Sequence, residues 1–397
     1  MEHRLNWLVT GAAMILLASC GDGEHARQQT PVKDTDTVAV VMDTLPKKIS
    51  GSYNRIFNDI ARYLAGMDPE PGCMLDSSYL ENKDWKQYAE NAEKKWHLYD
   101  SSRIQVLKDW GRAELAAINS GPFTLFYPFS GPDILHADCF YPEADTTVMI
   151  GLEPVGTVPF TDKSKSDTLA KYFASVTRSL YAILNFSFFR TEAMKKDLRT
   201  AELNGTTPLM MIFLQRTGNR VLDVKYIHID SAGRIAGNEP GKSYKSPGVE
   251  ITYCHADSTG EARLFYFSTD LSNEGLTKTS PAFLRYLYTL GYAHTYLKSA
   301  SYLMYNDFFS EIRSLILKQS LTVLQDDSGI PHRFFTGCKP SLYGKYSGVI
   351  SLFKGNEQKD LDSLFKSQPA KPLDFGIGYK WHKGESNLVL YECARRP

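Results

Sequence analysis

The chain has no excess of either charge, because 45 lysine and arginine residues balance 45 aspartate and glutamate residues over 397 positions. A protein that neutralises nucleic-acid phosphates needs a basic excess or a clustered basic face. No run in this chain holds more than a few basic residues. The sequence therefore predicts no nucleic-acid partner, and it gives no support to binding of an anionic surface by charge alone.

Motifs that would fix a chemistry are also missing. The chain has no Cys-x-x-Cys, no His-Glu-x-x-His, no calcium loop of alternating Asp and Asn, and no Gly-x-Ser-x-Gly. His-x-Asp occurs three times, from His136, His228 and His255, but such pairs are expected by chance among nine histidines. Gly376-Ile377-Gly378 lacks the third glycine and the following helix of a phosphate-binding loop. We predict no metal and no cofactor.

A short apolar segment is the strongest feature of the N-terminal region. It runs from Trp7 to Leu17, follows Arg4 and leads into Leu17-Ala18-Ser19-Cys20. About 11 residues are too few to cross a hydrocarbon core as a helix, which takes roughly 20, but they suit a secretory signal. The junction resembles the lipobox of bacterial lipoproteins. The resemblance implies cleavage before Cys20, acylation of that residue, and a mature chain held on a membrane by its lipid anchor.

We predict three parts: a signal peptide at 1–19, a lipidated cysteine with a flexible spacer at 20–48, and a globular domain at 49–397. The spacer is rich in glycine, proline and polar residues, which cannot bury a core. The resemblance places the protein in the cell envelope, with the outer membrane as the expected membrane. Five cysteines remain beside Cys20; an odd number cannot all pair, and their wide spacing favours at most one disulfide, with a second left open.

Hydrophobic periodicity predicts a mixture of helices and strands in the globular part. Helical spacing covers 52–65, 84–115 with a break near 100–101, 167–186, 281–305, 307–319 and 358–365. Short apolar runs between turn residues predict strands at 124–129, 147–152, 209–215, 221–230, 249–255, 263–268, 321–324 and 388–391. Hairpin-like turns join the four strands from 209 to 268. We therefore predict an α+β fold, an antiparallel sheet flanked by helices in a single large domain; two α/β lobes meeting near residue 205 are the alternative.

Polar residues gather where predicted strands end. Asp326 and Asp327 follow one apolar run, with His332 and Arg333 a few residues later. Binding and catalytic groups collect at strand ends, and adjacent carboxylates that converge in a turn can raise one pKa enough for acid or base chemistry. The same residues are also ordinary turn formers.

Two earlier strand ends carry further candidates. Ser130 and Asp133 follow the strand at 124–129, and Glu153 follows the strand at 147–152. Ser130 would need a base such as His136 or His332 to act as a nucleophile; otherwise Ser130 and Asp133 cap the next helix. These segments and residues 343–346 are similar to uncharacterised bacterial secreted proteins of unassigned activity, a resemblance that implies no residue roles.

Two functions remain open, and the sequence leaves undecided whether the protein is an enzyme. The first is an envelope lipoprotein that binds a sugar, a peptide or a protein partner in a cleft rimmed by Ser130, Asp133, Glu153, Asp326 and Asp327. The second is an envelope hydrolase that uses the same carboxylates, with His332 as acid or base and Arg333 holding an anionic group. The 23 tyrosines and 21 phenylalanines permit a ring-lined cleft, for which Tyr343, Tyr346, Tyr379 and Trp381 are candidates.

Overall fold

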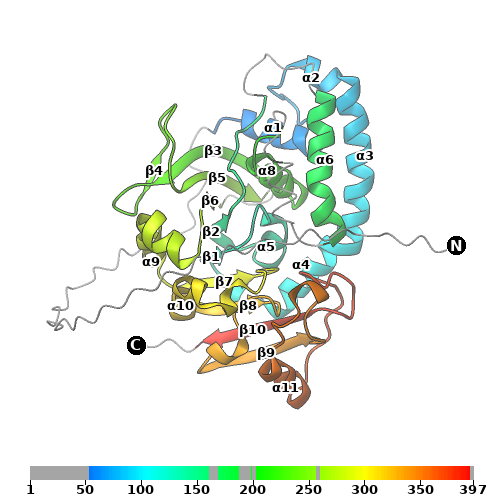
Figure 1. Cartoon of the computed structure of the whole chain (residues 1–397). Helices are drawn as coiled ribbons and strands as arrows, with labels where there is room; N and C mark the ends of the chain where they lie inside the picture. The colour runs from blue at the N-terminus through cyan, green and yellow to red at the C-terminus, as the bar shows by residue number, and fades with distance from the viewer. Residues whose placement is uncertain (1–52, 161–168, 187–197, 199–202, 256–259, 394–397) are drawn as a thin grey trace. The chain divides into compact units, whose positions relative to one another are not determined.

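One sheet organises the part of the chain that the computed structural model describes, residues 53–160, 169–186, 198, 203–255 and 260–393 (Figure 1). Ten strands follow the order β4-β3-β5-β6-β2-β1-β7-β8-β10-β9 in this mixed α/β domain. The strands are β1 Phe123–Tyr127, β2 Ala144–Gly151, β3 Asn219–Ile229, β4 Ile235–Gly237, β5 Pro247–His255, β6 Ala262–Ser268, β7 Ala293–Leu297, β8 Ser320–Gln325, β9 Cys338–Gly344 and β10 Asn387–Cys393. The predicted signal peptide and spacer, with Cys20, lie outside the described residues.

The centre of the sheet is parallel, which corrects the expectation of an antiparallel sheet. Strands β6, β2, β1, β7 and β8 pair in parallel, while β3, β4 and β5 on one side and β10 with its neighbours on the other pair antiparallel. Parallel neighbours need a long crossover, usually a helix, between them. Helix α5 (Ile134–Phe140) lies in the crossover from β1 to β2, and α10 (Ser310–Gln319) lies in that from β7 to β8. Helix α9 (Pro281–Thr289) lies between β6 and β7, which β2 and β1 separate in the sheet.

Two segments differ in type from the prediction. Residues 209–215, predicted as a strand, lie in helix α8 (Thr207–Arg216), which is buried nearly all round, so its short apolar run shows no helical face. The helix predicted over 281–305 ends at Thr289, because Gly291 turns the chain with a φ of 68°. The chain then forms β7, the strand beside β1 at the middle of the sheet.

Other predicted elements are confirmed. Helix α1 (Ile56–Leu64) and helix α6 (Leu169–Phe186) lie where helical spacing was found. The long pattern at 84–115 forms α3 (Lys83–Tyr99) and α4 (Gln105–Glu114), separated by a π-helical turn at Asp100–Ile104. Short helices α2 (Ser77–Glu81) and α11 (Lys359–Ser367) complete the set that Figure 1 labels.

Alternate residues of the central strands feed two apolar cores, one on each face of the sheet. On β1, Leu125 and Tyr127 join the core that includes Trp96 of α3 and Phe213 of α8, whereas Phe126 joins the core that includes Phe283 of α9. This alternation follows from the period of two along a strand. Helices therefore cover both faces and leave the ends of the strands as the place for a cavity.

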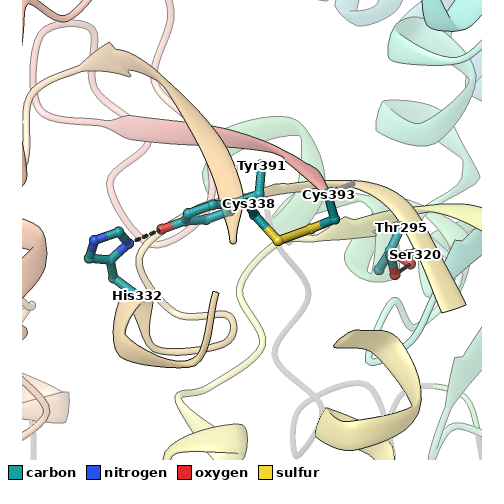
Figure 2. Close-up of a disulfide and its surroundings, with 6 residues drawn as sticks. All are labelled: Thr295, Ser320, His332, Cys338, Tyr391 and Cys393. Carbon is teal, nitrogen blue, oxygen red and sulfur yellow. Dashed lines mark hydrogen bonds between the residues drawn. A yellow bond between two sulfur atoms is a disulfide. The ribbon is translucent and has the colours of Figure 1, made fainter. Parts of the chain in front are cut away.

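One disulfide joins the last two strands in sequence. Cys338 of β9 and Cys393 of β10 lie directly opposite one another, with their Cα atoms 4.2 Å apart (Figure 2). Cys73, Cys139 and Cys254 are unpaired. The expectation of at most one disulfide is therefore confirmed for the described residues.

None of the described helices has both the length and the hydropathy of a membrane-spanning segment.

Candidate functional site

A cavity of about 620 Å³ opens at the carboxyl ends of the parallel strands. Tyr127 ends β1, Gly151 ends β2, and Lys298 directly follows β7; all three line the cavity. The chain lays β2 on one side of β1 and later returns to lay β7 on the other side. In open α/β sheets, ligands bind at such a switch point, outside the carboxyl ends of the strands.

The wall of the cavity is mostly apolar and aromatic. Its apolar side chains are Tyr127, Phe129, Ile150, Leu152, Leu271, Ala300, Leu303, Phe309, Ile350, Leu352, Phe353, Tyr379 and Trp381. Its polar side chains are Ser130, Asp133, Glu153, Thr269, Asp270, Lys298, Ser299 and Ser301. A mainly apolar wall with a few placed polar groups is the usual composition of a small-molecule site.

A buried ion pair forms part of this wall. Lys298 Nζ lies 2.5 Å from Asp133 Oδ2, and the two side chains are 2% and 1% exposed. The Tyr127 hydroxyl donates to the same carboxylate over 2.9 Å, and His136 Nδ1 lies 2.8 Å from its other oxygen. Asp133 also accepts from the backbone N–H of His136 and so caps α5, the role expected of a helix-capping aspartate.

Charges in this cluster are set by burial and by one another. Burial alone raises the pKa of Asp133, but His136 and Lys298 outweigh it and lower that pKa to about 2. Burial lowers the pKa of His136 to about 4, despite the adjacent carboxylate, and it also lowers the pKa of Lys298. At neutral pH the cluster therefore holds an ionised aspartate beside a neutral imidazole, with the Lys298 nitrogen 2.5 Å from the carboxylate.

Ser130 and Glu153 lie at neighbouring strand ends, and both are buried in the wall. The Ser130 hydroxyl donates to the carbonyl oxygens of Gly131 and Ile150 over 2.9 and 3.2 Å, which ties the β1 loop to β2. A Cβ added at Gly151 would lie 2.5 Å from Glu153 Oε2 and 3.0 Å from Gly131 Cα. Glycine at 151 is therefore what lets these two strand ends approach closely.

Asp326 and Asp327 are adjacent in sequence but turn to different partners. Asp326 accepts from the backbone N–H of the cavity residue Ser299 over 3.0 Å and from Ser328. Asp327 accepts from the Tyr302 hydroxyl over 2.7 Å and from Asn387. Asp326 thus lies directly behind the cavity wall, whereas Asp327 is not among the lining residues.

Asp326 should make the free energy of unfolding fall as the pH rises from about 4 to about 6. Burial, reinforced by the charge of Asp327, raises the pKa of Asp326 from 3.8 to about 6. A raised carboxyl pKa stabilises the folded state below the unfolded pKa, and this contribution is lost as pH rises through about 6. Relative to Asp326→Asn, the native protein should therefore lose stability between pH 4 and pH 6, by at most about 1.4 kcal/mol per pH unit. Urea unfolding of both proteins across this range measures the difference; parallel pH curves would contradict the raised pKa.

His332 and Arg333 lie away from the cavity. His332 Nδ1 is 3.0 Å from the Tyr391 hydroxyl, near the Cys338–Cys393 disulfide (Figure 2). Arg333 is exposed, with its guanidinium 4.8 Å from the centre of the Phe334 ring. The structure thus brings together Ser130, Asp133 and Glu153, places Asp326 behind them, and puts the other three candidates outside the lining.

Several cavity residues have no signal in the sequence. Lys298 directly follows β7, and this strand lies inside the helix predicted over 281–305, so the sequence pattern does not indicate a strand end at Lys298. Phe129, Ser299 and Ser301 have φ values of 60°, 53° and 55°, and they are three of the five described non-glycine residues with positive φ. Such strained backbone costs of order 1–3 kcal/mol per residue and clusters at functional sites. The strain therefore supports a functional role for this cavity independently of its size.

The C-terminal wall is held in place from the π-helical turn. Arg103 in that turn donates to the carbonyl oxygens of Gly376 and Trp381. The Tyr379 hydroxyl bonds to the Ser301 hydroxyl and donates to the Ser299 carbonyl over 2.9 Å. Single π-helical turns inside longer helices are frequent at functional sites, and here the turn orients an arginine toward the segment that carries Trp381.

Comparison with known proteins provides no assignment. No family model, no curated protein and no solved structure matches this chain. In the part of the chain that is described, no cluster of three or more His, Cys, Asp or Glu residues could hold a metal ion.

Proposed function

We propose that this protein is a cell-envelope lipoprotein whose globular domain binds a small organic ligand in the cavity at the ends of β1, β2 and β7. The observation that carries the proposal is the cavity of about 620 Å³, with the buried Asp133–Lys298 pair and Glu153 in its wall. Small-molecule sites typically measure about 300–1,000 Å³ and combine apolar walls with a few polar groups.

The polar groups favour a ligand that carries hydroxyl groups, such as a sugar. Hydroxyls both donate and accept, so one ligand group can donate to Ser130 or to a carboxylate of Asp133 or Glu153 and accept from Lys298. The rings of Tyr379 and Trp381 offer apolar faces for the ligand body. We do not propose hydrolysis, because His332, the acid or base of that alternative, is outside the cavity lining.

An envelope location is supported by two features of different kinds. The lipobox-like junction at Cys20 is typical of a lipid-anchored chain, and the Cys338–Cys393 disulfide is typical of an oxidising compartment. Replacing Cys20 by serine should prevent acylation and move the protein from the membrane fraction to the soluble fraction. Fractionation followed by mass spectrometry of the N-terminal peptide tests this; unchanged membrane partitioning and processing would contradict the lipoprotein assignment.

Filling the cavity tests the binding proposal. Leu303 lines the cavity, and Leu303→Trp should occupy part of its volume with a larger ring. We expect the wild-type full chain to bind the fluorescent probe 8-anilinonaphthalene-1-sulfonate with saturation, and Leu303→Trp to weaken this binding at least tenfold. Leu98→Trp, at a site on α3 that is 68% exposed, is the matched control and should bind like wild type. Equal binding by all three proteins, each shown to be folded by circular dichroism, would contradict the proposal.

A further inference from the structure

Charged and aliphatic side chains of the cavity differ in their exposure to solvent. Three of its four charged residues, Asp133, Glu153 and Lys298, are 1%, 2% and 3% exposed, whereas the fourth, Asp270, is exposed. Its lining residues Leu152 and Leu352 are 49% and 74% exposed, so they mark the mouth. Three charged side chains therefore lie in the buried part of the site, and two leucines together with Asp270 lie at its solvent-facing rim.

We propose that the ligand is an amphiphile with a hydroxylated head and one alkyl chain, an inference that rests on the proposed binding function. The head lies against Ser130, Asp133, Glu153 and Lys298, and the alkyl chain leaves the cavity between Leu152 and Leu352. A hydroxylated head can add hydrogen bonds to this polar cluster, because each hydroxyl both donates and accepts, whereas an alkyl chain can add none. Exposed leucines gain nothing from a ligand that is polar throughout, but they gain from packing against an alkyl chain.

Other apolar side chains of the lining agree with an alkyl chain in the cavity. Phe309 and Phe353 come from segments far apart in the chain, and both line the cavity together with Ile350 and Leu303. Leu152 directly follows β2, and Leu352 lies in the segment after β9, so the mouth is built from two separate parts of the fold. The same cavity thus offers apolar side chains as well as the buried polar cluster and the exposed leucines.

A series of alkyl glucosides with one head and different chains tests the inference. Methyl, butyl and hexyl β-D-glucoside, each below the concentration at which it forms micelles, are titrated by calorimetry into the full chain carrying Cys20→Ser, which lacks the thiol to be acylated. A buried methylene contributes about 0.8 kcal/mol, a factor of about four in affinity, and a half-exposed one less. We expect hexyl β-D-glucoside to bind at least tenfold more tightly than the methyl compound.

Substitutions at the mouth of the cavity test where the alkyl chain of the ligand lies. Leu352→Asp should reduce the hexyl-to-methyl affinity ratio at least fivefold, Leu152→Asp should act in the same direction, and the exposed Leu98→Asp should leave the ratio unchanged. Both mouth leucines are well exposed, so these variants should fold.

Each other result overturns the inference in a recognisable way. Equal affinities along the series would leave the binding function intact and reject the alkyl chain. If affinity still rises with alkyl-chain length in both mouth variants, the alkyl chain does not lie between Leu152 and Leu352. If no glucoside binds while the fluorescent probe still binds in a manner sensitive to Leu303→Trp, the hydroxylated amphiphile is rejected; if the probe also fails to bind, the proposed function is rejected with it.

Discussion

Replacing Lys298 by methionine is expected to lower the free energy of unfolding by about 3–5 kcal/mol, the usual cost of breaking a buried ion pair by removing one partner. Asp133 would remain almost fully buried without the Lys298 nitrogen 2.5 Å away, so less would oppose the burial that raises its pKa. Methionine has nearly the length of lysine, so packing is largely kept. Urea unfolding at pH 7, analysed by linear extrapolation, measures the effect.

Two further variants separate the charge effect from lost contacts. The double variant Asp133→Asn with Lys298→Met should recover much of the loss, because removing both charges leaves no unpaired ion, and asparagine still caps α5. Lys94→Met breaks the exposed Lys94–Glu90 pair and should change stability by less than about 0.5 kcal/mol. A Lys298→Met loss as small as that of Lys94→Met would show that the buried pair is not charged.

Removing the disulfide is expected to cost about 4 kcal/mol of stability. The bridge closes a loop with a sequence separation of 55 residues, and the chain-entropy relation for a loop of this length gives about that value. The closed loop carries the cavity residues Ile350, Leu352, Phe353, Tyr379 and Trp381. The double variant Cys338→Ser with Cys393→Ser should therefore unfold at a lower urea concentration and bind the fluorescent probe several-fold more weakly.

The unpaired Cys73 provides the control for this double variant. Cys73→Ser removes a half-buried thiol without opening a loop and should change stability by less than about 1 kcal/mol. A dithiothreitol-treated wild-type protein should behave like the double serine variant. Equal urea midpoints for the double variant and Cys73→Ser would show that the bridge contributes nothing to stability.

Local patterns in the sequence determined the elements that begin and end with clear signals. Apolar spacing and the polar break near Asp100 predict α3 and α4, since one helical face must be buried and side chains repeat every three to four residues. The strand ends before Ser130 and Glu153 were recognisable from their turn residues, and the cavity does lie at these ends. Here the information is carried by residues close together in the chain, so no knowledge of distant partners is needed.

Tertiary structure alone decided the strand order and the electrostatics of the site. Residues 209–215 became a helix and 293–297 a strand because each is buried among distant partners, and short apolar runs satisfy either periodicity. Lys298 meets His136 and Asp133 across a separation of more than 160 residues, which no local pattern encodes. Asp326 and Asp327 are adjacent in sequence but accept hydrogen bonds from different residues, Ser299 and Tyr302. Hydrogen bonds and desolvation depend on which groups are close in space, so the sequence does not predict this difference.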